Sequence, residues 1–156
     1  MQEIERTFLL DALPPDLEGR PSTRIAQGYL AITDDVEVRV RSRGDDRLLT
    51  VKSGRGNVRR EVTVPLTVEQ FDELWQLTPG RRVVKRRWVV GHGGNELEID
   101  VFDGALDGLL LVEIEFDSCD DSAAFSPPDW FGPEVTDDHR YRNAALAVDG
   151  VPDRSR

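Results

Sequence analysis

Acidic and basic side chains recur at every second position in separate segments of this chain. Three segments carry acid-x-acid pairs and two carry base-x-base pairs: Glu3 with Glu5, Glu98 with Asp100, Glu113 with Glu115, Arg39 with Arg41, and Lys85 with Arg87. Carboxylates are hard oxygen ligands suited to Mg²⁺ or Mn²⁺, and Arg and Lys neutralise phosphate oxygens. A polyphosphate bridged by metal ions would satisfy both groups of side chains.

A spacing of two places these side chains on one face of β-strands, because successive side chains of a strand alternate between faces. Apolar residues alternate with them, and Gly, Asp and Pro clusters separate the segments. We therefore expect strands at about 3–11, 23–33, 36–43, 47–53, 58–64, 82–90, 95–102 and 109–117.

Two helices are expected beside these strands. Thr67 and Gln70 form a capping-box pattern ahead of an apolar stripe, which predicts a helix over 67–77. A second helix is predicted over 137–148, and the Pro-containing stretch 126–133 is predicted to be loop.

The charged strand faces have two interpretations. In the first, each charged face is exposed to water on one side of an antiparallel sheet. In the second, the acidic and basic side chains converge inside one lumen. The second is favoured because the acid-x-acid and base-x-base pairs occur on separate strands. We therefore predict an α+β, mainly β fold: a closed antiparallel β-barrel of about eight strands with a charged lumen, and with the helices outside on its apolar face.

Length and composition fit one ordinary domain. The 156 residues, 38% of them apolar and 32% charged, predict a domain over 1–149 and a disordered tail over 150–156.

A net charge of −10 argues against a nucleic-acid partner, and no apolar run is long enough for a membrane span. The acidic N-terminus and the single Cys119 favour a cytoplasmic protein. Apolar strand faces left uncovered would favour a homodimer.

The ordered set of motifs resembles the CYTH superfamily, also called triphosphate tunnel metalloenzymes. The resemblance runs nearly end to end, and its blocks are Glu3-Ile4-Glu5, Arg39-x-Arg41, Lys52, Arg59-x-Glu61, Lys85-x-Arg87, Glu98-x-Asp100, Glu113-x-Glu115 and Asp138-x-Arg140-Tyr141-x-Asn143. Members include inorganic triphosphatases, thiamine triphosphatases and class IV adenylate cyclases.

The resemblance implies a role for each of these residues. The metal ligands for Mg²⁺ or Mn²⁺ would be Glu3, Glu5, Asp100, Glu113 and Glu115. The triphosphate would be bound by Arg39, Arg41, Lys52, Arg59, Lys85, Arg87 and Arg140. The catalytic carboxylates would be Glu5 and Glu61, the latter orienting the attacking water.

One position departs from the family pattern. Thr7 stands where the family usually has a lysine that binds substrate and orients water.

The expected activity is metal-dependent hydrolysis of inorganic triphosphate or a related triphosphate compound. Two alternatives stay open: a module that binds triphosphate or polyphosphate without hydrolysis, which Thr7 would favour, and an adenylate cyclase.

Overall fold

The computed structural model describes residues 4–54 and 60–154, so the predicted site residues Glu3 and Arg59 lie outside the described part. All eight predicted strands are present, and each pairs antiparallel with its neighbours. They are β1 (Ile4–Leu9), β2 (Thr23–Ile32), β3 (Val36–Arg43), β4 (Asp46–Ser53), β5 (Arg60–Pro65), β6 (Arg82–His92), β7 (Asn95–Phe102) and β8 (Leu110–Phe116).

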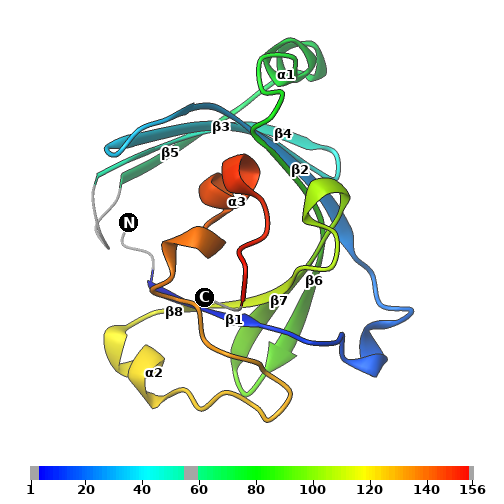
Figure 1. The fold of residues 1–156 in the computed structure, drawn as a ribbon, viewed down its shortest axis with the longest axis vertical. Coiled ribbons are helices and arrows are strands. Elements are labelled where there is room, and N and C mark those ends of the chain that lie inside the picture. Colours follow the sequence, from blue (N-terminus) through cyan, green and yellow to red (C-terminus); the bar gives the residue numbers. More distant parts are fainter. Residues whose placement is uncertain (1–3, 55–59, 155–156) are drawn as a thin grey trace.

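The strands form one curved sheet in the order β1-β8-β7-β6-β2-β3-β4-β5, with β1 and β5 at its edges (Figure 1). The prediction of a closed barrel is therefore wrong, because no ladder joins β1 to β5 among the described residues. The alternating pattern does predict which side chains share a face. It carries no information about whether the first and last strands meet.

The free edge of β1 is taken by the C-terminal part of the chain. Gly132 N donates to Leu9 O at 2.7 Å, Leu9 N to Pro133 O at 2.9 Å, and Val135 N to Thr7 O at 2.8 Å. Because these backbone groups of β1 already bond to residues 132–135, a strand that paired with them would have to displace that segment. The Thr7–Leu9 part of this sheet edge is therefore covered by residues 132–135 and not by β5.

The predicted helix at 67–77 is confirmed as α1 (Val68–Trp75). Thr67 Oγ1 accepts from the Gln70 backbone, and the Gln70 side chain accepts from the Thr67 backbone, so the capping box is formed. Helix α1 packs against β3 and β4 on the convex side of the sheet. It therefore lies outside the curve, as expected (Figure 1).

The C-terminal helix lies elsewhere than predicted. Segment 137–148 forms a 3-10 turn (His139–Tyr141) and α3 (Asn143–Asp149), which contacts β2 and β6 and lies inside the curve of the sheet (Figure 1). Tyr141 and Leu146 are buried there against Leu9, Val83 and other apolar residues. The concave face is thus apolar at one end, where α3 covers it, and charged at the other.

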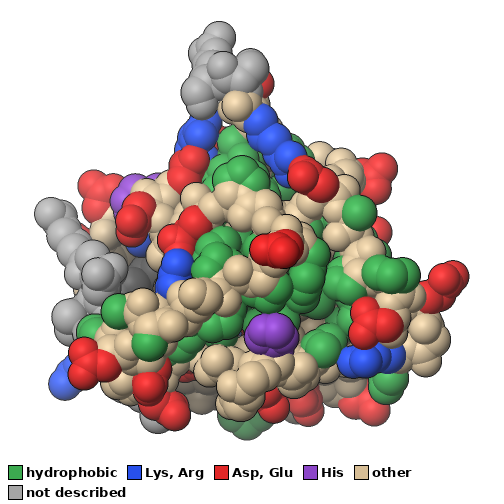
Figure 2. Space-filling model, turned by 90° about the horizontal axis from the view of Figure 1, so that it is seen from below, with side chains coloured by type: hydrophobic (Ala, Val, Ile, Leu, Met, Phe, Trp, Pro, Cys, Tyr) green, Lys and Arg blue, Asp and Glu red, His purple; other side chains and the backbone are tan. Residues whose placement is uncertain are grey.

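The convex face of β1, β8, β7 and β6 holds the second apolar core. Leu97, Ile99, Val112 and Ile114 are buried there beneath Leu17, and beneath Phe125 and Phe131 from the segment after α2 (Cys119–Ala124). Seen from the side where α2 lies, apolar side chains gather centrally and charged ones stand mostly toward the rim (Figure 2). No helix in the described part of the chain is long and apolar enough to cross a membrane.

Candidate active site

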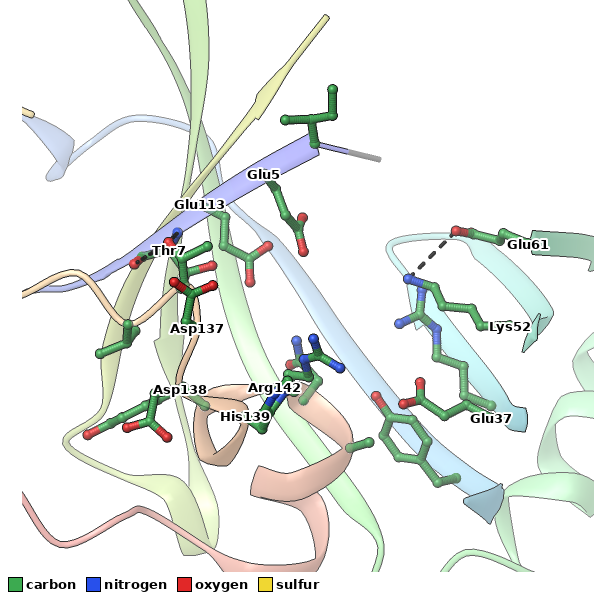
Figure 3. Close-up of a pocket in the computed structure, with 18 of the residues that line it drawn as sticks. Glu5, Thr7, Glu37, Lys52, Glu61, Glu113, Asp137, Asp138, His139 and Arg142 are labelled. Atoms are coloured by element: carbon green, nitrogen blue, oxygen red, sulfur yellow. Dashed lines mark hydrogen bonds and ion pairs between the residues drawn. The ribbon is translucent and has the colours of Figure 1, made fainter. Parts of the chain in front are cut away.

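A cavity of about 540 Å³ opens between the charged end of the concave face and the C-terminal segment. Five of the predicted site residues line it: Glu5, Arg39, Lys52, Glu61 and Glu113. They come from the two opposite ends of the sheet order, Glu5 and Glu113 from β1 and β8, and the other three from β3, β4 and β5. The curvature of the sheet brings both of its edges to one cavity (Figure 3).

The acidic wall is built by β1 and β8. Thr7 and Glu113 are direct partners across the two strands, and so are Glu5 and Glu115. Figure 3 shows the carboxylates of Glu5 and Glu113 side by side, directed into the cavity. Burial raises the pKa of the Glu113 carboxyl, and the positive charge of Lys85 opposes this only in part. An anionic Glu113 is therefore costly there unless a cation comes close.

The basic wall is built by β3 and β4. Lys52 Nζ lies 3.6 Å from Glu61 Oε2 on the neighbouring strand β5, and Glu37 faces Lys52 from β3. Arg39 Nε is buried and is the one buried side-chain nitrogen or oxygen in the described residues that has no hydrogen-bond partner. A buried N–H donor of this kind is costly unless an acceptor reaches it, which suits an anionic ligand in the cavity.

Four predicted site residues lie beside the cavity and bond mainly to other protein groups. Lys85 Nζ lies 2.8 Å from Asp100 Oδ2, and Arg87 Nη1 lies 2.7 Å from Glu98 Oε2. Two further hydrogen bonds join Arg87 to Asp100, and Arg41 donates through Nε and Nη2 to Gln27 Oε1. These groups form a buried charged layer beneath the cavity.

The layer has strongly shifted pKa values. Burial lowers the pKa of Arg41 to about 10, with Arg39 and Arg87 adding to the effect. Burial also lowers the pKa of Lys85, although Asp100 opposes it. Burial alone would raise the pKa of Asp100, but Lys85 and Arg87 outweigh it and hold the value at about 2. Asp100 is thus a stable anion shared by two cations.

The last two predicted residues are exposed. Glu115 lies on the outer part of β8 and is not among the cavity-lining residues. Arg140 donates to both carboxylate oxygens of Asp138, at 2.9 and 2.7 Å, and this pair stands at the surface. Their predicted roles in metal and substrate binding stay predictions.

The structure also adds residues that sequence reasoning missed. Tyr29, Glu37, Asp137, His139 and Arg142 line the cavity. Glu37 shares the period-two face of Arg39 and Arg41, so its position was readable from the spacing. Tyr29 shares a face with Gln27, whose Nε2 donates to the Tyr29 hydroxyl at 3.1 Å. The sequence spacing did not indicate Asp137, His139 or Arg142, because they belong to the irregular segment that precedes α3.

The donor set fits a magnesium or manganese ion held jointly with substrate. In the described residues no three His, Cys, Asp or Glu side chains form a ready-made metal site. Mg²⁺ commonly takes one or two protein carboxylates and fills its other positions with water and substrate phosphates. Glu5 and Glu113 are such a pair.

Comparison with known proteins gives two close relatives. The chain is 46% identical over 151 residues to an inorganic triphosphatase of Nitrosomonas europaea, covering 95% of this chain and 98% of that one. It is 35% identical over 149 residues to an inorganic triphosphatase of Acetivibrio thermocellus, covering 93% and 92%. No family model matches the chain.

Solved structures agree with these relatives. The crystal structure of an inorganic triphosphatase, 43% identical, superposes with a TM-score of 0.76 over 98% of both chains. An adenylyl cyclase candidate from Hippeastrum with a dominant triphosphatase activity superposes with a TM-score of 0.55 at 12% identity, over 78% of this chain and 82% of that one. At that identity the second match supports the fold alone.

Proposed function

The chain belongs to the CYTH superfamily of triphosphate tunnel enzymes, and we propose that it hydrolyses inorganic triphosphate to pyrophosphate and phosphate with the help of Mg²⁺ or Mn²⁺. The single observation that carries the proposal is the cavity itself. Carboxylates of β1 and β8 face basic side chains of β3 and β4 across it, on a chain closely similar to inorganic triphosphatases.

Glu5 and Glu113 would hold the metal ion. When bound there, Mg²⁺ or Mn²⁺ would neutralise developing charge on the phosphate oxygens. The raised pKa of Glu113 supports this assignment, because a nearby divalent cation favours the ionised carboxylate that the cavity otherwise disfavours.

Arg39 and Lys52 would bind the phosphate oxygens. The buried Nε of Arg39 gains an acceptor when a phosphate occupies the cavity, so substrate binding relieves an existing cost. Lys52 forms an ion pair with Glu61, and it would also donate a charge-assisted hydrogen bond to a phosphate beside it. Phosphoryl transfer depends mainly on such positioning and charge neutralisation.

A carboxylate is also needed to orient the attacking water. Glu61 enters the cavity from the wall opposite Glu5 and is held in place by Lys52 (Figure 3). A carboxylate in this position can accept a hydrogen bond from the attacking water. In this proposal Glu61 orients the attacking water, and Glu5 binds the metal ion.

The cytoplasmic location and the homodimer stay predictions.

The test is a phosphate-release assay over inorganic triphosphate, ATP, thiamine triphosphate and longer polyphosphate, with Mg²⁺, Mn²⁺ or chelator. We expect release from triphosphate that requires metal and is lost in Glu5→Ala protein. Cyclic AMP and pyrophosphate formed from ATP would instead indicate an adenylate cyclase. Tight calorimetric binding of triphosphate without release from any substrate would indicate a binding module and would overturn the hydrolase proposal.

A further inference from the structure

The charge balance of the cavity is unfavourable for a polyanion. Six carboxylates and three basic side chains stand among the described residues that line it. One of the three bases, Lys52, is already paired with Glu61 at 3.6 Å. A bound triphosphate therefore needs every basic side chain that the cavity offers, in addition to metal ions.

Among the described residues of β1, no cation lines the cavity, since Arg6 pairs with Glu134 outside it. Thr7 is neutral, and its backbone is fastened to the C-terminal segment. Thr7 N donates to Thr136 Oγ1 at 3.0 Å and Thr7 O accepts from Val135 N at 2.8 Å. A cation for phosphate groups near Glu5 and Glu113 has to come from another segment.

Arg142 meets this need. It lines the cavity and projects from the C-terminal segment toward the space between the Glu5 and Glu113 carboxylates and the Lys52–Glu61 pair (Figure 3). In the described part of the chain, no carboxylate forms an ion pair with its guanidinium. Its charge is therefore available to a ligand.

The backbone of Arg142 is held rigidly although its side chain is exposed. Tyr141 before it and Ala144 after it are buried, and the Arg142 carbonyl accepts from Leu146 N at 2.9 Å in the first turn of α3. The adjacent Asn143 accepts through Oδ1 from the buried Lys85 Nζ at 3.1 Å. The charged layer under the cavity thereby fixes the point from which Arg142 extends, which lowers the ordering cost of binding.

We propose that Arg142 is a substrate-binding residue that supplies, from the C-terminal segment, the phosphate-binding cation that Thr7 does not provide on β1. This inference rests on the proposed function. A guanidinium there donates to phosphate oxygens in a planar, bidentate geometry. The Lys85–Asn143 contact is the positioning element for this side chain.

Two measurements on the full chain test the assignment. The first is calorimetric binding of a non-hydrolysable, methylene-bridged triphosphate analogue with Mg²⁺, and the second is KM for inorganic triphosphate. We expect Arg142→Ala to weaken binding by about 10- to 100-fold and to raise KM in parallel, as for loss of a charge-assisted hydrogen bond. Adding Thr7→Lys to Arg142→Ala is expected to restore much of the affinity.

The matched control is Arg20→Ala, which also removes one exposed arginine. Arg20 pairs with Asp16 at the surface, does not line the cavity, and should leave binding unchanged. Unfolding midpoints identify any folding defect, and Arg142→Gln, which keeps much of the side-chain length, serves as a second variant.

The outcomes separate the two claims. Unchanged affinity in both Arg142→Ala and Arg142→Gln would overturn the role of Arg142 and leave the hydrolase proposal standing. Wild-type protein that neither binds the analogue nor hydrolyses triphosphate would contradict the proposed function, and the Arg142 assignment with it.

Discussion

Arg87 and Asp100 face each other across β6 and β7 and are joined by two parallel hydrogen bonds, Nε to Oδ1 at 2.7 Å and Nη2 to Oδ2 at 2.8 Å. Asp100 also receives Lys85, and all three side chains are nearly inaccessible to solvent. From the sequence, Asp100 was expected to bind metal, and Lys85 and Arg87 to bind phosphate. In the structure these three side chains bond to one another beneath the cavity.

Removing the shared anion should strongly destabilise the protein. Asp100→Ala leaves Lys85 and Arg87 buried without their common partner, and breaking a buried pair in this way costs about 3–5 kcal/mol. Denaturant unfolding of the metal-free protein measures the change. The surface variant Asp16→Ala, which removes the exposed partner of Arg20, is expected to cost about 0.5 kcal/mol or less. Equal effects in the two variants would contradict a structural role for Asp100.

The same cluster predicts a pH dependence of stability. The pKa of Asp100 is lowered by folding from 3.8 to about 2, so the folded protein favours its ionised form. This stabilisation is complete above the unfolded pKa and is lost as the pH falls from about 4 towards 2. Unfolding free energies of the metal-free protein should decline across that window, and the decline should be shallower in Asp100→Asn. Identical slopes in the two proteins would show that other groups control acid unfolding.

Much of the fold was readable from the spacing of residues. Period-two alternation located all eight strands, and the Thr67 and Gln70 pair located α1, because these signals are local. The closure of the sheet was not predictable in this way. It depends on which segment pairs with the free edge of β1, and residues 132–135 lie in a Pro- and Gly-containing stretch with no strand pattern.

The candidate site was predicted only in part, because the alternating pattern tells which strand face a side chain occupies and nothing more. Alternation places Glu5, Arg39, Lys52, Glu61 and Glu113 on the concave face, and the cavity brings those five together. It does not distinguish a side chain that meets the cavity from one buried beneath it, as with Lys85. That difference arises from α3 and Asn143, which cover one end of the concave face.

The pairing of β1 with the C-terminal segment should be sensitive to Gly132. A Cβ at this position would lie 2.7 Å from the Leu9 carbonyl oxygen, so any side chain pushes the two backbones apart. We expect Gly132→Ala to destabilise the protein by about 1–3 kcal/mol. Gly91→Ala is the control, since a Cβ there meets nothing within 4 Å, and it should change stability by about 0.5 kcal/mol or less. Thermal or denaturant unfolding of the two variants compares them directly.

Glu5 and Glu115 are direct partners across β1 and β8, yet only Glu5 is among the cavity-lining residues. If metal binding follows the cavity, Glu5→Gln should lower triphosphate hydrolysis on the order of 100-fold and raise the Mg²⁺ concentration needed for half-maximal rate. Glu115→Gln should lose less on both measures, because its carboxylate is exposed on β8. Glu69→Gln, on the exposed face of α1, controls for the loss of one negative charge. Rates measured over a Mg²⁺ series decide the matter: a larger loss in Glu115→Gln than in Glu5→Gln would place the metal outside the cavity, toward the exposed end of the two strands.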